Sequence, residues 1–180
     1  MKLMFASDIH GSLYYAKKMC EIFEKEKADK LVLLGDILYH GPRNDLPEEY
    51  NPKGVIELMN SMAEKLLCVR GNCDTEVDQM VLDFPVLADY GYIYDGKINI
   101  YLSHGHIYNP DNLIKGVKGC VLVNGHTHVF ALDEMPWGVY ANPGSVSIPK
   151  NSNPPTYMIY ENGKFEIKDF DANVLKQLTV

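Results

Sequence analysis

Short apolar runs alternate with helical patterns over the first 70 residues, which is typical of an α/β protein. Residues 2–7, 31–34 and 66–69 are apolar runs that predict buried strands. Ser12 is a residue type that favours helix N-caps, and apolar residues recur at helical spacing over residues 16–23. A second such stripe over residues 55–63 predicts another amphipathic helix.

The second half of the chain is richer in strand patterns. Asp95-Gly96 predicts a hairpin turn that joins residues 92–94 to residues 98–102, and Asn162-Gly163 predicts another. Residues 121–123 form one more apolar run. Since no internal repeat or linker interrupts the sequence, we expect a single domain over residues 1–180.

Polar clusters follow the predicted strands directly. They are Asp8-Ile9-His10, Gly35-Asp36, Gly71-Asn72-Cys73-Asp74, Ser103-His104-Gly105-His106 and Gly125-His126-Thr127-His128. Ligands of open α/β sheets bind outside the carboxyl ends of the strands, so we expect the first three clusters to share one crevice.

The side chains in these clusters indicate a metal site. Imidazole and carboxylate together suit Mn, Fe, Co or Zn, whereas Mg alone would favour an all-oxygen set of ligands. On an extended segment, His126 and His128 would point the same way and could bind one ion together. A glycine before Asp36, Asn72 and His126 would let the backbone bend sharply.

Composition and charge limit the partners of the protein. The net charge is −7, and Lys and Arg are scattered, which disfavours binding to long nucleic acids. Bound divalent cations could still make an acidic cleft attractive to small phosphate esters. We find no signal peptide, membrane-spanning run or disulfide pattern, so we expect a cytoplasmic protein with reduced cysteines.

The ordered motifs resemble those of a known family. SDIHGS, GD followed by HGPRN, VRGNCD, SHGH, NGHTH and NPGSVSIPK are similar to the signature of the calcineurin-like metallophosphoesterase superfamily, and most similar to its bacterial YfcE-type phosphodiesterases. The resemblance covers nearly the whole chain. It implies an α/β (α+β) fold, a four-layer αββα sandwich of two mixed sheets flanked by helices.

The same resemblance implies a set of metal ligands. Asp8, His10 and His128 would bind one metal ion and Asn72, His104 and His126 the other, with Asp36 bridging both. Two such ions about 3.5–4 Å apart can share a hydroxide that attacks a phosphodiester in line. No covalent nucleophile is then required.

Three further residues are candidates for catalysis. His106 would donate a proton to the leaving group, contact phosphate or line the cleft. Many family members have histidine where this chain has Cys73, and a neutral thiol protonates a leaving oxygen less well. We therefore predict a preference for good leaving groups. Asp74 would orient a neighbouring group or cap a helix over residues 75–80.

The HGPRN block supplies candidates for substrate binding. Arg43 can bind phosphate oxygens with two N–H groups, and Asn44 lies beside it. His40 is either a substrate contact or an ordinary loop residue. The block Asn142-Pro143-Gly144-Ser145 is either a structural loop or a support for the metal site.

The sequence thus predicts a metal-dependent phosphodiesterase that acts on a small phosphodiester. We expect two divalent metal ions, with Mn first and Fe, Co, Zn, Ni or Mg as alternatives. A phosphomonoesterase or nuclease using the same ions, and a non-catalytic scaffold like the related retromer subunit, are the alternative functions. Similar proteins form homodimers or homotetramers, and we expect the same here, without a membrane partner.

Overall fold

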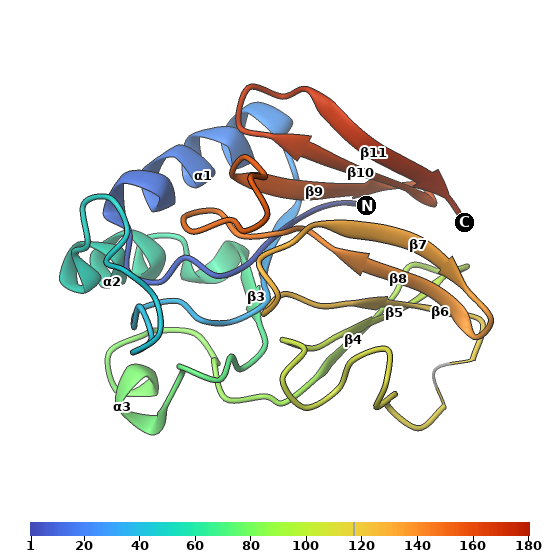
Figure 1. The fold of residues 1–180 in the computed structure, drawn as a ribbon, viewed down its shortest axis with the longest axis horizontal. Helices are drawn as coiled ribbons and strands as arrows, with labels where there is room; N and C mark the ends of the chain where they lie inside the picture. Colours follow the sequence, from blue (N-terminus) through green and yellow to red (C-terminus); the bar gives the residue numbers. More distant parts are fainter. Residues whose placement is uncertain (117) are drawn as a thin grey trace.

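Two β-sheets pack face to face in the computed structural model of the chain, which describes residues 1–116 and 118–180 (Figure 1). Within these residues one sheet has the strand order β11-β10-β9-β1-β2-β3 and the other β4-β5-β6-β8-β7. The first sheet contains β1 (Lys2–Ala6), β2 (Lys30–Leu33), β3 (Leu66–Cys68), β9 (Thr156–Glu161), β10 (Lys164–Asp169) and β11 (Val174–Thr179). The second contains β4 (Gly91–Tyr94), β5 (Asn99–Leu102), β6 (Cys120–Val123), β7 (Ala131–Met135) and β8 (Gly138–Asn142).

The first helix forms where the sequence predicts it. Helix α1 (Leu13–Glu26) begins after Ser12, whose hydroxyl accepts a hydrogen bond from the Tyr15 N–H at 3.3 Å. It ends at Lys27, which has a left-handed backbone with φ of 53°. Its apolar face packs on the outer face of the first sheet, in a core that includes Phe23 and Leu33.

The second helix is shorter than its apolar pattern suggests. Helix α2 (Pro52–Asn60) begins after Asn51, whose side chain accepts a hydrogen bond from the Gly54 N–H at 3.1 Å. The chain then turns through a short 3₁₀ helix, η1 (Ala63–Lys65), before β3. Residues 62 and 63 still pack against the core, although they lie outside the helix, because the chain must turn there to enter β3.

Parallel strands bring the polar clusters to one edge of each sheet. β1, β2 and β3 are mutually parallel, and so are β5, β6 and β8. Between the sheets, alternate strand residues such as Phe5, Val32, Val121 and Val139 form a buried core. The rigid sandwich therefore presents its strand ends, and the residues after them, at fixed positions.

Both predicted hairpins are present. β4 and β5 are antiparallel around Asp95-Gly96, and β9 and β10 are antiparallel around Asn162-Gly163. Local patterns do not indicate that β9 pairs with β1 in the middle of the first sheet, since about 150 residues separate the two strands. The β7–β8 hairpin was also not predicted.

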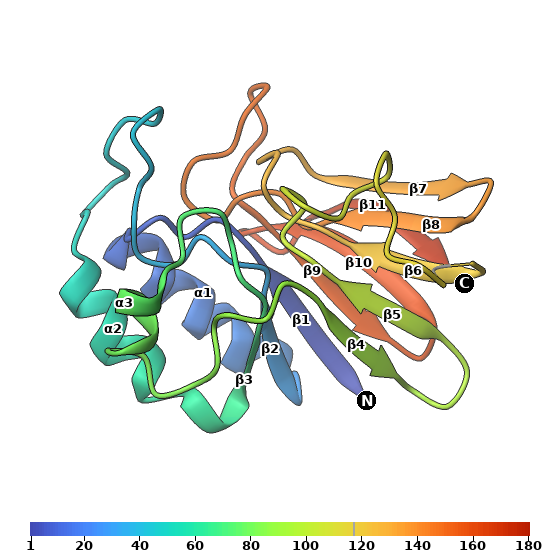
Figure 2. The same cartoon turned by 90° about the horizontal axis from the view of Figure 1, so that it is seen from below.

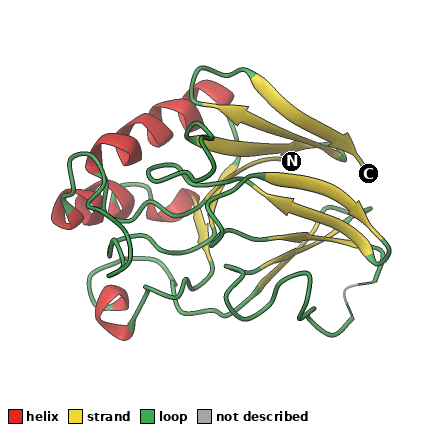
Figure 3. Cartoon of the chain, in the orientation of Figure 1, coloured by secondary structure: helices red, strands yellow, loops and turns green. Residues whose placement is uncertain are grey.

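The layers around the two sheets differ. Helices α1 and α2 lie on one side of the molecule, against the first sheet (Figure 3). The outer face of the second sheet instead packs Cys120 and Leu122 against Ile114, which belongs to the loop between β5 and β6. The two mixed sheets are thus confirmed, but a loop forms the fourth layer, because Gly105, Pro110 and nearby glycines disfavour a helix there. None of the described helices has both the length and the apolar character needed to cross a membrane.

Candidate metal centre

The polar clusters from both sheets meet at the carboxyl ends of the strands. Asp8 and His10 follow β1, Asp36 follows β2 and Asn72 follows β3; His104 follows β5, and His126 and His128 follow β6. Five of these side chains are buried, His126 is half-buried and Asn72 is exposed. The structure therefore gathers all seven candidate ligands predicted from the sequence.

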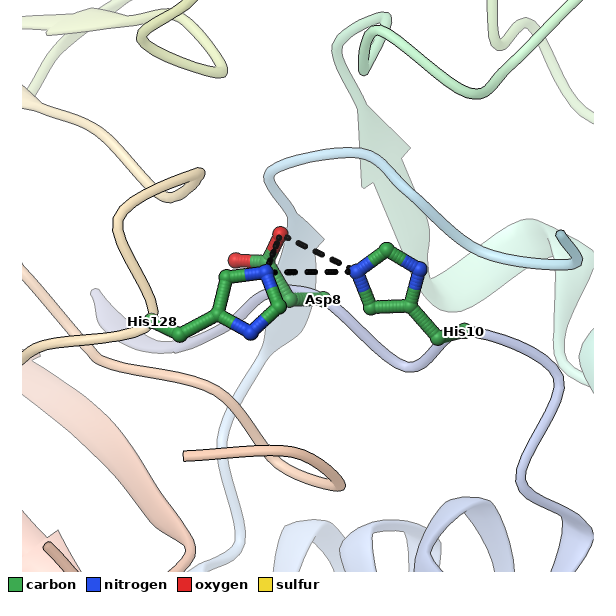
Figure 4. A group of neighbouring side chains, drawn as sticks. All are labelled: Asp8, His10 and His128. Carbon is green, nitrogen blue, oxygen red and sulfur yellow. Dashed lines mark hydrogen bonds and ion pairs between the residues drawn. The ribbon is translucent and has the colours of Figure 1, made fainter. Parts of the chain in front are cut away.

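Asp8, His10 and His128 form the first group (Figure 4). Asp8 Oδ1 lies 3.3 Å from His128 Nε2 and 3.6 Å from His10 Nε2. The two Nε2 atoms are themselves 3.3 Å apart. Three potential ligand atoms, from two segments that are distant in the sequence, thus point at one position.

Asp36 connects this group to a second one. Its Oδ2 lies 3.7 Å from His10 Nε2 and 3.5 Å from His104 Nε2. His104 Nε2 in turn lies 3.1 Å from Asn72 Oδ1 and 3.2 Å from His126 Nδ1. Asp36 therefore lies between the two groups of side chains.

Hydrogen bonds orient three of the histidine rings. The Nδ1 atoms of His10, His104 and His128 lie 2.7, 2.6 and 2.8 Å from the backbone carbonyls of Tyr39, Leu34 and Ile148. A carbonyl only accepts hydrogen bonds, so each Nδ1 carries the proton, and in the neutral ring Nε2 presents a lone pair. This arrangement is common in metal-binding histidines.

The cluster contains unsatisfied ligand atoms that fit a cation. Asp8 Oδ1 is buried and accepts no hydrogen bond within the described residues. The facing Nε2 lone pairs of His10 and His128 would repel each other at 3.3 Å unless a proton or metal ion lies between them. Carboxylate, imidazole and amide donors together suit a divalent transition metal.

Electrostatics in the cluster also favour positive charge. Burial opposes ionisation of Asp8, but the nearby histidines outweigh burial and hold the pKa of this carboxyl well below its usual value. Burial likewise opposes protonation of His104, but Asp36 and Asp8 raise its pKa to about 9. The carboxylates thus attract a cation to the cluster.

Five of the candidate ligands have unusual backbone conformations. Asp8, His10, Asp36, His126 and His128 have φ values of 58°, 51°, 55°, 67° and 61°. Non-glycine residues rarely adopt this left-handed region, and strained residues of this kind gather at functional sites. The prediction that His126 and His128 lie on an extended segment is therefore wrong. Their rings converge because the backbone turns, and residue types alone do not reveal such turns.

Asp74 fixes two of the loops that carry the cluster. Its Oδ2 accepts hydrogen bonds from the N–H groups of Asp36 and Gly71 at 2.8 and 2.7 Å, and its Oδ1 accepts one from Ile37 at 3.0 Å. The backbone of Gly71 also packs closely against Asp36. A Cβ added to Gly71 would lie only 2.1 Å from Asp36 Oδ1, so a larger residue would not fit there. Asp74 thus orients its neighbours, while Thr75 caps α3 (Glu76–Gln79).

The loop after β8 forms hydrogen bonds with the backbone of the cluster. The hydroxyls of Ser145 and Ser147 donate hydrogen bonds to the Asp8 carbonyl at 2.9 and 3.0 Å. Ser145 Oγ also accepts from the N–H of Ile148 at 3.0 Å. The block that begins at Asn142 therefore holds the backbone of Asp8, as one of the two sequence interpretations suggested.

A pocket of about 400 Å³ opens beside the cluster. Arg43 and Asn44, the candidates for substrate binding, line it, and so does Cys73. Thr127 and Lys150 line it too, and sequence reasoning missed them. The position of Lys150 at the end of the NPGSVSIPK motif was the available signal.

His106 and Cys73 lie close to the candidate ligands. The His106 ring centroid is 5.4 Å from that of His104, and its Nδ1 is buried without a hydrogen-bond partner among the described residues. The Cys73 N–H donates a hydrogen bond to Asp36 Oδ1 at 2.8 Å. Cys73 also groups with His10 and Asp36 as a potential ligand set. Cys73 lines the 400 Å³ pocket, and His106 lines a neighbouring pocket that shares His126 and Thr127 with it.

His40 differs from the other predicted contacts. It is absent from the residues that line the 400 Å³ pocket, and its ring packs against Tyr39 and Tyr50 with centroid distances of 4.8 and 5.2 Å. Its carbonyl accepts a hydrogen bond from the Asn44 side chain at 2.8 Å. These contacts favour the interpretation of His40 as a loop residue.

Comparisons with known proteins agree with this geometry. Residues 1–164 match the family model of the calcineurin-like phosphoesterase superfamily domain. The chain belongs to this superfamily. It is 45% identical over its full length to phosphodiesterase YfcE of Escherichia coli K12, of which it covers 98%.

Solved structures agree as well. The solved structure of YfcE, a phosphoesterase from E. coli, matches this chain with a TM-score of 0.96 and 46% identity, over 99% of each chain. Vacuolar protein sorting 29 from Cryptosporidium parvum matches with a TM-score of 0.65 and 18% identity, over 99% of this chain and 98% of that one. The second match concerns the fold alone.

Proposed function

We propose that this chain is a metal-dependent phosphodiesterase that hydrolyses small phosphodiesters. The observation that carries the proposal is the continuous set of seven side chains, linked through Asp36, whose free ligand atoms face one another at the strand ends. The full-length similarity to phosphodiesterase YfcE supports it.

In this proposal Asp8, His10 and His128 hold one divalent metal ion. Asn72, His104 and His126 hold a second, and Asp36 contributes to both. When bound, the ions would supply a nucleophilic water at neutral pH and stabilise the charge of the phosphoryl oxygens. We propose Mn²⁺ because mixed imidazole, carboxylate and amide ligands suit it, with Fe, Co, Zn, Ni or Mg as alternatives.

Other side chains of the chain would bind and orient the ester. Arg43 lines the pocket with a guanidinium that can hold two oxygens of a substrate phosphate group, and Asn44 stabilises the same loop. Asp74 keeps the backbone of Asp36 in place through its hydrogen bonds. His106 or Cys73 would donate the proton that the leaving alcohol requires, since both side chains lie beside the cluster.

Location and assembly complete the proposal. The four cysteines are free in the structure, which supports a reducing compartment such as the cytoplasm. Tyr90, Tyr92 and Tyr94 are exposed along or beside the edge strand β4, and exposed tyrosines are frequent at interfaces. We propose a homodimer or homotetramer on this basis.

A substrate panel tests the proposed activity. The full-length protein, loaded with Mn²⁺, is assayed with bis(p-nitrophenyl) phosphate and with p-nitrophenyl phosphate. We expect the diester to be hydrolysed faster, and Asp36→Asn to lose about 10²-fold or more of kcat/KM because it weakens a ligand shared by both ions. Hydrolysis of the monoester alone, or no hydrolysis of either ester despite bound metal, would overturn the proposal.

A further inference from the structure

Two cationic side chains border the 400 Å³ pocket from two different loops. Arg43 lies between β2 and α2, and Lys150 lies between β8 and β9; Figure 2 shows both loops rising on the same side of the molecule. Asp36 is the single acidic residue among those lining the pocket in the described part of the chain. Positive charge is thus concentrated here, although the whole chain has a net charge of −7.

Neither cation is neutralised by a neighbour. Arg43 and Lys150 form no ion pair within residues 1–116 and 118–180, whereas the other arginine, Arg70, pairs with Asp89. Both side chains are exposed and available to a ligand.

The backbone of Lys150 is fixed relative to the candidate metal centre. Its N–H donates a hydrogen bond to the His128 carbonyl at 3.1 Å, while His128 Nδ1 donates to the Ile148 carbonyl at 2.8 Å. The Lys150 carbonyl accepts from the Asn153 N–H at 3.1 Å, across a turn in which two residues have left-handed backbones. The ring of His128 and the backbone of Lys150 are therefore held by one segment.

The loop of Arg43 is fixed in the same way. His10 Nδ1 donates to the Tyr39 carbonyl at 2.7 Å, and the Asn44 side chain donates to the His40 carbonyl at 2.8 Å. The Asn44 N–H donates to the Gly41 carbonyl at 3.3 Å and closes the turn that contains Arg43. Each cation thus lies on a loop whose carbonyl orients a histidine of the Asp8 group.

The charge at the site exceeds what a simple diester requires. A phosphodiester carries one negative charge, and two divalent ions bound as proposed above would already exceed the combined charge of Asp8 and Asp36. Two further unpaired cations would therefore attract a substrate that carries additional negative charge. A terminal phosphate carries a charge of about −1.5 to −2 and would supply this additional negative charge in a compact group.

We propose that Lys150 and Arg43 bind a second phosphate group on one substituent of the ester, so that the preferred substrates are phosphodiesters bearing an additional phosphate. This inference rests on the proposed phosphodiesterase activity and specifies its substrate class. It assigns Lys150 a role in specificity.

A matched pair of substrates tests the inference. Thymidine 5′-(p-nitrophenyl phosphate) and its 3′-phosphorylated derivative share the reacting diester and the leaving group, and they differ in one phosphate. We expect the full-length, Mn²⁺-loaded protein to show about tenfold higher kcat/KM on the 3′-phosphorylated substrate, a preference that falls as salt is added. In Lys150→Ala the ratio of the two kcat/KM values should fall to less than about threefold, and Lys150→Arg should restore it.

Lys53→Ala is the matched control, because Lys53 is an exposed cation on α2 that does not line the pocket. It changes the net charge equally and should keep the wild-type ratio. A wild-type ratio near one would overturn the inference while leaving the diesterase proposal intact, as would an equal loss on both substrates in Lys150→Ala. No hydrolysis of either substrate would count instead against the proposed activity.

Discussion

Among single residues, Cys73 has the clearest consequence for catalysis. Burial and the nearby Asp36 carboxylate raise the pKa of its thiol to about 12, so the thiol is neutral near pH 7 and a weak acid. A neutral thiol donates a proton to a leaving alkoxide less effectively than an imidazolium does. The residue lines the pocket, so a larger side chain there would face the substrate.

We expect Cys73→His to raise kcat/KM about tenfold on diesters with alkyl leaving groups and to change little on p-nitrophenyl esters. The added imidazole would protonate the poorer leaving group. The measurement is the dependence of kcat/KM on leaving-group pKa, with Cys20→Ser as a control for loss of a thiol away from the pocket. An unchanged slope would contradict this role of residue 73.

Asp74 should act by positioning. Asp74→Asn replaces one carboxylate oxygen by an N–H donor that faces backbone N–H groups, so we expect a loss of about 1–3 kcal/mol in the free energy of unfolding. Mn²⁺ affinity, measured by calorimetry where the variant is folded, should fall about tenfold or more, because Asp36 loses its support.

Asp78→Asn is the matched control. It makes the same change in an exposed capping box, where the Asp78 carboxylate accepts a hydrogen bond from the Thr75 N–H, and it should leave Mn²⁺ affinity unchanged. Equal metal affinity in Asp74→Asn and wild type would show that Asp74 serves stability alone.

Residue types revealed the candidate ligands, but not how the backbone aims them. The D-x-H and G-H-x-H motifs could be recognised because several such residues follow apolar runs in order. The left-handed backbone of Asp8, Asp36 and His126 could not be predicted from the sequence. Non-glycine residues adopt this conformation only when the surrounding structure compensates for its energetic cost. Lys150 likewise reaches the pocket through its bond to His128, which is remote in sequence.

Among the secondary-structure elements, helix α1 ends in a carboxylate, that of Glu26, which an isolated helix would disfavour at its C-terminus. Glu26 lies where the helix dipole is negative. Lys2, Tyr157 and Lys168, from three strands of the first sheet, each donate a hydrogen bond to its carboxylate at 2.9 Å. Burial opposes its ionisation, but these donors lower the pKa of Glu26 to about 2.

The depressed pKa gives stability that is present above the ordinary value of 4.5 and is lost as pH falls toward 2. We expect Glu26→Gln to lower the free energy of unfolding at pH 7 by about 1–3 kcal/mol, and the difference from wild type to shrink between pH 4.5 and pH 2. Denaturant unfolding at several pH values measures it.

Glu24→Gln on the same helix alters an exposed pair with Lys65 and should cost less than about 0.5 kcal/mol. A difference between Glu26→Gln and wild type that stays constant with pH would contradict the link between this carboxylate and acid stability.

Local patterns predicted the elements whose contacts are local. The N-cap of α1 and the Asp95-Gly96 and Asn162-Gly163 turns need few neighbours to form, and the structure contains all three. The early end of α2 and the insertion of β9 beside β1 depend on tertiary packing. Propensity and periodicity do not determine such contacts.

Across the whole molecule, metal binding should be coupled to stability. The candidate ligands come from segments that follow five strands in both sheets, so an ion that binds them favours the folded state. We expect Mn²⁺ at 100 times the dissociation constant of a site to add about 2.7 kcal/mol to the free energy of unfolding for each site that it fills, and a chelator to remove the gain. Thermal unfolding with and without Mn²⁺ measures this, and an equal gain in Asp36→Asn would indicate binding elsewhere.

These segments should hold two metal ions around Asp36, and an anomalous-scattering map from crystals grown with Mn²⁺ would locate the ions themselves. We expect two peaks, one among Asp8, His10 and His128 and one among Asn72, His104 and His126, both in contact with Asp36. Peaks away from these side chains, or a single peak that does not contact Asp36, would rule out this arrangement.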